Sequence, residues 1–187
     1  MNSKKLTKTQ IQDKEIEEIE KRIKDTYHMD ENSLIKASNH FKDLPISERT
    51  KKGLKESRFF VMTPIQKATL KHSLYGKDIL GASKTGSGKT LSFVIPVLEI
   101  LYRNKWSSLD GLGALLILPT RELAIQVFEV FKLVGKYHDF SVGMVIGGND
   151  LEREKDNIYN MNILIGTPGR LSHHVSETAY FTTDNLK

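Results

Sequence analysis

Short apolar runs alternate with longer amphipathic segments from about residue 41 onward. Each run is rich in Ile, Leu or Val at successive positions, which is typical of strands buried on both faces. Between the runs, apolar residues recur at the spacing of helix turns. The sequence therefore predicts four strands, over residues 78–82, 114–119, 142–146 and 163–166.

This alternation predicts an α/β fold, a doubly wound parallel sheet flanked by helices. Ligands of such sheets bind at the carboxyl ends of the strands, so the loops that follow the strands are the candidate sites. Helices are predicted over residues 47–56, 64–74, 89–101, 121–136, 151–159 and 169–175.

Residues 1–38 have a different composition, with much Lys and Glu and few large apolar side chains. One helix is predicted over about 13–26, where Ile16, Ile19 and Ile23 form a narrow stripe. We interpret this segment as a charged arm, solvated or partly disordered, that precedes a domain over 39–187. The alternative is that the isoleucine stripe packs on a partner or on the domain itself.

Composition adds constraints on the class of protein. The net charge of +5 favours an anionic partner, and the absence of cysteine removes disulfides and thiolate chemistry. The apolar runs are far shorter than the ~20 residues that cross a bilayer, so no membrane partner is expected.

The most informative segment is Ser83-Lys84-Thr85-Gly86-Ser87-Gly88-Lys89-Thr90, between a predicted strand and a predicted helix. Glycines let backbone N–H groups approach a phosphate, and the helix start adds a positive dipole end. In such a phosphate loop, Lys89 would reach the β- and γ-phosphates and Thr90 would be a ligand of Mg²⁺. The strict pattern has Gly where Ser83 stands, at the position farthest from the phosphates. A merely flexible turn is the alternative.

Three further polar segments follow strand ends: Pro119-Thr120-Arg121, Gly147-Gly148 and Thr167-Pro168-Gly169-Arg170. Each offers a helix start, a hydroxyl or an arginine, which suit phosphate oxygens. Taken singly, they are equally typical of turns and helix caps. Their position predicts that they share one edge of the sheet with the phosphate loop.

Together these motifs, with Pro119-Thr120-Arg121-Glu122-Leu123-Ala124, resemble the first RecA-like domain of DEAD-box ATP-dependent RNA helicases. Phe41 and the segment Phe59-Phe60-Val61-Met62-Thr63-Pro64-Ile65-Gln66 resemble the family's adenine-reading Q motif. The sequences of residues 81–90, 106–113 and 136–141 are similar to those of a nucleolar subgroup of the family that acts in small-subunit ribosome assembly. This resemblance implies a P-loop NTPase fold and, as partners, pre-rRNA or snoRNA duplexes and ribosome-assembly proteins, in the nucleus and nucleolus.

The resemblance also implies a role for each matching residue. The amide of Gln66 carries a donor and an acceptor, which suit N7 and N6 of adenine together. Phe41 would stack on the adenine, with an ordinary core aromatic as the alternative. ATP would be bound by Phe41, Thr63, Gln66, Ser83, Lys84, Thr85, Gly86, Ser87, Gly88, Lys89 and Thr90, with Lys89 and Thr90 as the catalytic residues. RNA would be bound by Pro119, Thr120, Arg121, Gly147, Gly148, Thr167, Pro168, Gly169 and Arg170.

The sequence also departs from the family pattern. Met62 and Arg58 stand where the family usually has Pro and Gly, and no Asp-Glu-Ala-Asp tetrad occurs. That tetrad holds Mg²⁺ and positions the attacking water. We therefore interpret the chain as the N-terminal part of a helicase. By itself, this part would bind ATP and RNA but would not hydrolyse ATP or unwind RNA.

Two other interpretations remain open. One is a non-catalytic RNA- or protein-binding module of a ribonucleoprotein particle, and the other is a different phosphate-loop enzyme, against which the adenine-reading segment argues. The adjacent His173 and His174 have no visible third metal ligand, so we expect them to be surface residues.

Overall fold

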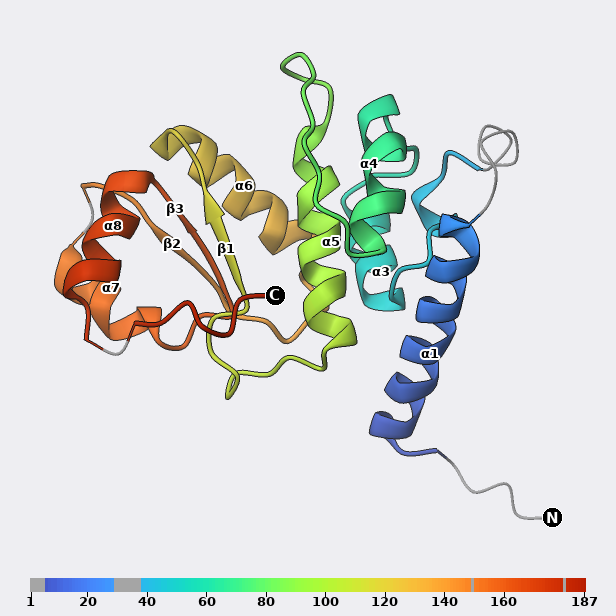
Figure 1. The fold of residues 1–187 in the computed structure, drawn as a ribbon, viewed down its shortest axis with the longest axis horizontal. Helices are drawn as coiled ribbons and strands as arrows, with labels where there is room; N and C mark the ends of the chain where they lie inside the picture. Colours follow the sequence, from blue (N-terminus) through green and yellow to red (C-terminus); the bar gives the residue numbers. More distant parts are fainter. Residues whose placement is uncertain (1–5, 29–37, 149, 180) are drawn as a thin grey trace. The chain divides into compact units, whose positions relative to one another are not determined.

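The computed structural model describes residues 6–28, 38–148, 150–179 and 181–187. Internal contacts divide the chain into two compact units, one up to Glu99 and the other from Ile100. The boundary falls within helix α5, Lys89–Arg103 (Figure 1). Among the described helices, none combines the length and the apolar character that spanning a membrane requires.

The first unit is helical in the residues that the structure describes before α5. Polar side chains fix several starts: Thr7 and Gln10 form reciprocal side-chain to backbone hydrogen bonds of 3.0 and 3.2 Å. Ser47 accepts from the backbone of Thr50 in the same way. The elements are α1 (Lys8–Tyr27), the 3-10 helix η1 (Phe41–Asp43), α3 (Glu48–Glu56) and α4 (Pro64–Leu74).

Helix α1 packs on its own unit. Ile16, Ile19 and Ile23 are all buried, and α1 contacts α4. The expectation of a solvated arm is therefore wrong for α1, because the stripe, though narrow, is covered along about two turns. The alternative, docking on the domain itself, describes the structure. Residues 1–5 and 29–37 of the predicted arm lie outside the described residues, and the boundary at 38/39 stays a prediction.

Polar and aromatic contacts fix the docked position of α1. Arg22 Nη2 donates to the carbonyl oxygen of Asp43 at 3.0 Å. Glu15 Oε1 accepts from the backbone N–H of Glu48 at 2.7 Å, where its charge faces the positive end of α3. The rings of Tyr27 and Tyr75 stack with centroids 3.7 Å apart and planes inclined by 7°.

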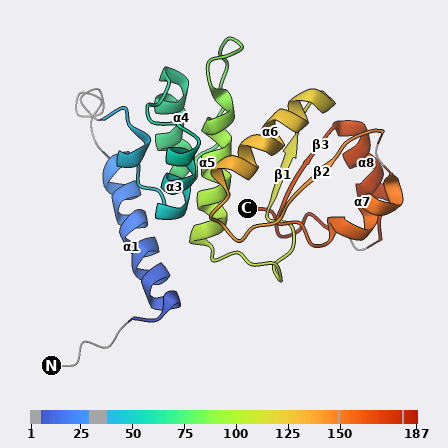
Figure 2. The ribbon, with the colours of Figure 1, turned by 180° about the vertical axis from the view of Figure 1, so that it is seen from behind.

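The second unit is built on a three-stranded parallel sheet, in the order β1-β3-β2. Ala114 and Val142 both pair with Ile163, so the three strands end level. Helix α6 covers one face, and α7 and α8 cover the other (Figures 1 and 2). The elements are β1 (Ala114–Ile117), α6 (Arg121–Val134), β2 (Val142–Val145), α7 (Leu151–Ile158), β3 (Ile163–Gly166) and α8 (Pro168–Glu177).

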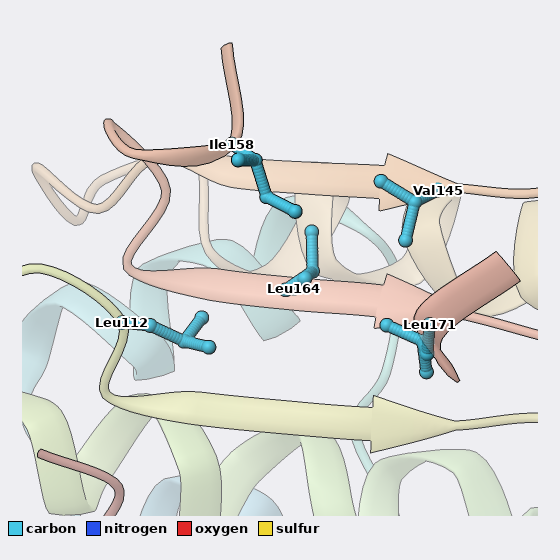
Figure 3. Close-up of a cluster of buried hydrophobic side chains, with 5 residues drawn as sticks. All are labelled: Leu112, Val145, Ile158, Leu164 and Leu171. Carbon is cyan, nitrogen blue, oxygen red and sulfur yellow. The ribbon is translucent and has the colours of Figure 1, made fainter. Parts of the chain in front are cut away.

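A cluster of aliphatic side chains holds this sheet to its helices. Leu164, near the middle of β3, lies between Ile158 of α7 and Leu171 of α8, with Val145 and Leu112 beside them (Figure 3). All five are at most 7% exposed. Burial of this apolar area fixes α7 and α8, and hence the loops at the strand ends. The predicted α/β fold is confirmed.

One predicted strand, 78–82, is wrong. It forms no regular secondary structure and pairs with no strand in the described part of the chain, and Leu80 is 104% exposed. An apolar run reports only a preference for burial, whereas a strand also needs a neighbour to complete its hydrogen-bond ladder.

Candidate nucleotide and nucleic-acid sites

The phosphate loop in the first unit has the backbone that its glycines predict. Gly86 and Gly88 have φ of +76° and +86°, in the left-handed region that favours glycine. A Cβ at Gly86 would meet nothing within 4 Å, so that side of the loop is open. Helix α5 begins at Lys89, directly after the loop. The arrangement provides space and a positive helix end for an anionic group.

Lys89 lies folded back into this loop. Its Nζ donates to the carbonyl oxygens of Ser83 and of Lys84, the latter at 2.8 Å. The hydroxyls of Ser83 and Ser87 are 2.7 Å apart and close the loop. Ser83, which replaces the glycine of the strict pattern, thus adds a hydrogen bond that glycine does not supply. The ammonium sits among oxygen acceptors, which phosphate oxygens can replace.

Thr90 follows in the first turn of α5 and is half-buried. A hydroxyl oxygen at the start of that helix is a suitable ligand for the hard cation Mg²⁺, which prefers oxygen donors. Thr90 therefore offers one oxygen donor at the start of α5, and its role as a ligand of Mg²⁺ stays a prediction.

Gln66 links the predicted adenine-reading segment to the phosphate loop. It is 3% exposed, and its Oε1 accepts from the N–H of Thr63 at 2.8 Å. Its Nε2 donates to the carbonyl oxygen of Gly88, also at 2.8 Å. Thr63 is the N-cap of α4, whose first turn carries Gln66. Reading adenine would require this amide to exchange its present partners.

Phe41 lies in the wall of a cavity of about 710 Å³ that also contacts Phe59 and Phe60. Phe41 is only 2% exposed, and its N–H donates to the carbonyl oxygen of Phe60 at 3.0 Å. Stacking of its ring on adenine stays a prediction. Arg58, where the family usually has Gly, has φ of +60°, so it adopts the conformation for which glycine is suited.

In the second unit, the loops at the strand ends surround a cavity of about 730 Å³. The three segments that sequence analysis singled out all contribute to its wall, although Gly148 and Pro168 do not. Glu122 and His173 complete the lining. The predicted residues that line it are Pro119, Thr120, Arg121, Gly147, Thr167, Gly169 and Arg170.

The guanidinium of Arg121 lies against Gly147 and Gly148. A Cβ on either glycine would come within 3.0 Å of a terminal nitrogen of Arg121. Gly148 also has φ of +98°. Gly148 is therefore favoured by the turn, and the lack of a Cβ at both glycines leaves room for the arginine beside them. Thr120 caps α6 by accepting from the N–H of Leu123 at 3.2 Å, which fixes the start of the helix that carries Arg121.

Glu154 belongs to this region, and sequence analysis missed it. Its Oε2 accepts from Arg170 Nε at 2.6 Å and lies 3.0 Å from His174 Nε2. The expectation that His174 is a surface residue is wrong, because it is 0% exposed. His173 is half-buried. One signal was available in the sequence: Glu154 stands one helical turn before Ile158, on the same face as that apolar residue.

Comparison with known proteins agrees with these observations. The model of the DEAD/DEAH box helicase family matches residues 63–187. The chain is 60% identical over 151 residues to the probable ATP-dependent RNA helicase ddx10 of Dictyostelium discoideum, covering 81% of this chain and 17% of that protein. It is 56% identical over 156 residues to the ATP-dependent RNA helicase DBP4 of Kluyveromyces lactis, covering 83% of this chain and 20% of that protein.

A solved structure shows the same fold. It is the crystal structure of a hypothetical ATP-dependent RNA helicase from Sulfolobus tokodaii, 33% identical, with a TM-score of 0.62 over 71% of this chain and 37% of that chain. The chain spans about a fifth of the length of the curated relatives just named. Since the matched region contains the phosphate loop and all three segments around the second cavity, the chain belongs to the DEAD/DEAH box helicase family.

Proposed function

We propose that this chain binds ATP in its first unit and the backbone of RNA in its second, as part of an ATP-dependent RNA helicase. The observation that carries the proposal is the bond from Gln66 Nε2 to the carbonyl oxygen of Gly88. It joins a donor-and-acceptor amide, suited to adenine, to a glycine loop suited to phosphates. A single adenine nucleotide has both an adenine for the amide and phosphates for the loop.

On ATP binding, Lys89 exchanges the carbonyl oxygens of Ser83 and Lys84 for phosphate oxygens. The exchange is favourable because an anionic acceptor makes a stronger hydrogen bond than a neutral one. Gln66 turns its amide toward the adenine edge, which guanine does not match. Thr90 would supply an oxygen ligand to Mg²⁺, and the ion would neutralise charge on the phosphates. Phe41, Thr63 and the remaining loop residues, Lys84, Thr85 and Ser87, line the site.

RNA binding uses Arg121 and Arg170 together with the backbone groups and hydroxyls around them. Contacts of this kind read phosphates and sugars, so affinity depends weakly on base sequence and falls as salt rises. In the whole protein, we propose that ATP hydrolysis drives local separation of an RNA duplex.

The first experiment measures binding of fluorescent ATP and GTP analogues and of single-stranded RNA to this chain. We expect ATP to be preferred, Lys89→Ala to weaken both nucleotides, and Gln66→Ala to reduce the preference itself. Arg121→Ala should weaken RNA binding equally for different sequences and lower the salt slope by about one. RNA binding without any nucleotide binding would instead favour a non-catalytic module of a ribonucleoprotein particle.

The second experiment concerns turnover. We predict that the 187-residue chain binds ATP without hydrolysing it, and that the whole protein shows ATPase activity that RNA stimulates. Lys89→Ala in the whole protein should abolish that activity. Activity that survives this substitution contradicts the assignment of the phosphate loop.

We further propose that the RNA is a pre-rRNA or snoRNA duplex, that ribosome-assembly proteins are partners, and that the protein acts in the nucleolus. The support is the similarity of residues 81–90, 106–113 and 136–141 to the nucleolar subgroup. Crosslinking of the whole protein to RNA in cells tests this. Recovery mainly of pre-rRNA and snoRNA is expected, and recovery mainly of messenger RNA contradicts it.

A further inference from the structure

The carboxylate of Glu154 joins three segments of the second unit. Its Oε2 accepts from Arg170 Nε, and its Oε1 accepts from the N–H of Ile146 at 3.4 Å. Ile146 directly precedes Gly147-Gly148, and Arg170 closes the segment that begins at Thr167. A single side chain from α7 therefore touches two of the loops that line the second cavity.

This carboxylate is itself held firmly. The side chain of Glu154 is 8% exposed, and that of Arg170 is 16% exposed. On the other side of Oε2 lies His174, whose Nδ1 is 2.8 Å from the hydroxyl of Thr178. His174 is 0% exposed, so the chain from Thr178 through His174 to Glu154 is fixed by packing.

The contact determines how Arg170 presents its guanidinium. The bond to Glu154 uses the Nε donor, one of five N–H donors on the group, and Arg170 lies in the wall of the 730 Å³ cavity. A long side chain loses rotamer freedom when it binds a ligand, and one that is already ordered loses less. The negative charge of Glu154 acts in the opposite direction, because it repels a phosphate.

We infer that Glu154 is a positioning residue for RNA: it orders Arg170 and the loop after Ile146 for contact with the phosphate backbone. The inference rests on the RNA-binding role proposed above. We expect the ordering of Arg170 to favour RNA binding by more than the charge of Glu154 disfavours it. A substitution that removes the charge but keeps Arg170 ordered should therefore not weaken RNA binding.

Glu154→Gln separates order from charge. A glutamine with its carbonyl oxygen in the place of Oε2 keeps the contacts to Arg170 and His174 and removes the charge. Its NH2 group replaces Oε1 and cannot accept from the N–H of Ile146, so this variant tests the order of Arg170 and not that of the loop after Ile146. We expect this variant to bind single-stranded RNA as well as the original chain or better. Glu154→Ala removes the contacts and the charge together, and we expect it to weaken RNA binding by about tenfold, the size of a coupled pair.

A double-mutant cycle tests whether Glu154 affects RNA binding through Arg170. In an Arg170→Ala background, Glu154→Ala should cause a smaller loss of RNA affinity than in the original chain, because one of the two groups that Glu154 orders is already absent. RNA affinity is measured by fluorescence anisotropy with a mixed-sequence single strand. Glu152→Ala is the matched control: Glu152 is an exposed acid on the same helix, 2.9 Å from Lys155. Thermal unfolding of each variant is followed in parallel.

Several results would overturn the inference. Equal losses from Glu154→Ala with and without Arg170 would mean that Glu154 does not act through Arg170. If Glu154→Gln bound RNA as weakly as Glu154→Ala, the ordering of Arg170 would not be the cause of the loss. If the Ala variant does not fold, Glu154→Asp replaces it, since it keeps the charge but withdraws the oxygens, and unchanged RNA affinity then counts against positioning. If Arg121→Ala and Arg170→Ala both leave RNA binding unchanged, the proposed RNA site itself is contradicted, and not only the role of Glu154.

Discussion

The side-chain amide of Gln66 donates to the carbonyl oxygen of Gly88 across 2.8 Å, within the first unit. A Cβ on Gly88 would lie 2.7 Å from that same amide nitrogen. The two residues are therefore matched in size as well as in hydrogen bonding, and a side chain at position 88 must displace Gln66.

Gly88→Ala tests this relationship, with Gly86→Ala as its control. Both glycines have left-handed φ, so each substitution should destabilise by roughly 1 to 2 kcal/mol from the backbone alone. Only Gly88→Ala also breaks the bond to Gln66, which adds about 1 kcal/mol. Thermal unfolding should rank Gly88→Ala below Gly86→Ala, and equal stabilities would argue against the contact.

Docking of α1 is tested by Ile19→Ala. Ile19 is 3% exposed, and shortening a buried isoleucine costs about 2 to 5 kcal/mol. Ile11 lies on the same helix but is 54% exposed, so Ile11→Ala should change stability by less than about 0.5 kcal/mol. Hydrogen exchange of the α1 amides should accelerate only in the Ile19 variant. Similar exchange in both variants would mean that α1 is not docked in solution.

Asn162, just before β3, joins two loops of the second unit. Its Nδ2 donates to the carbonyl oxygens of Ser107 and Gly111 at 2.9 and 3.0 Å, and its Oδ1 accepts from Ser141. Because Asn162 is 0% exposed, Asn162→Ala leaves buried groups without partners and should destabilise by at least about 2 kcal/mol.

The single tryptophan reports this loss. Trp106 Nε1 donates to the carbonyl oxygen of Gly111, which Asn162 also contacts. Urea unfolding followed by Trp106 fluorescence should therefore shift to a lower midpoint in Asn162→Ala. Asn157→Ala is the control, because Asn157 is exposed and bonds only within its helix in the contact described, to the carbonyl oxygen of Arg153 at 2.7 Å. Equal midpoints in the two variants would contradict the role of Asn162.

Asp110 gives a pH dependence. Hydrogen bonds from the hydroxyl and then the N–H of Ser107 lower the pKa of its carboxyl, with a smaller effect from Lys187. A lowered folded pKa stabilises the protein above the unfolded pKa, and that stability is lost as pH falls through the folded pKa. The stability difference between the original chain and Asp110→Ala should therefore be constant near neutral pH and shrink below about pH 4.

Ser107→Ala is the companion to that measurement. It removes the largest cause of the shift, so the pKa of Asp110, followed by NMR titration, should rise toward its ordinary value. An unchanged pKa in Ser107→Ala would show that the hydroxyl is not responsible.

Most of the second unit follows from local pattern. Three of the apolar runs became the three strands, and capping residues such as Thr120 and Asp150 fixed the starts of helices between them. The segment 78–82 failed because pairing depends on a neighbour, which an apolar run cannot reveal about itself. Helix α1 was misjudged for a related reason: whether a three-residue stripe is buried depends on a surface elsewhere in the sequence.

Prediction of the candidate sites was uneven for physical reasons. Loops such as Gly86 to Lys89 follow local rules of backbone conformation, so sequence identifies them directly. Glu154 meets Arg170 only after α7 and α8 pack on the same face of the sheet. The sequence marks its helix face but does not distinguish it from the other acids of α7 until that partner is placed.

Two polar contacts of α1, those of Arg22 and Glu15, end on main-chain atoms, the carbonyl oxygen of Asp43 and the N–H of Glu48. Every amino acid supplies the carbonyl oxygen, and every one except proline supplies the N–H. Substitutions at positions 43 and 48 can therefore accumulate without removing either bond, whereas Glu15 and Arg22 cannot be exchanged so freely. For these two bonds, only the side chains of α1 are specific, because their partners are backbone atoms. Evolution or design can therefore strengthen or weaken the attachment by substitutions in α1 alone.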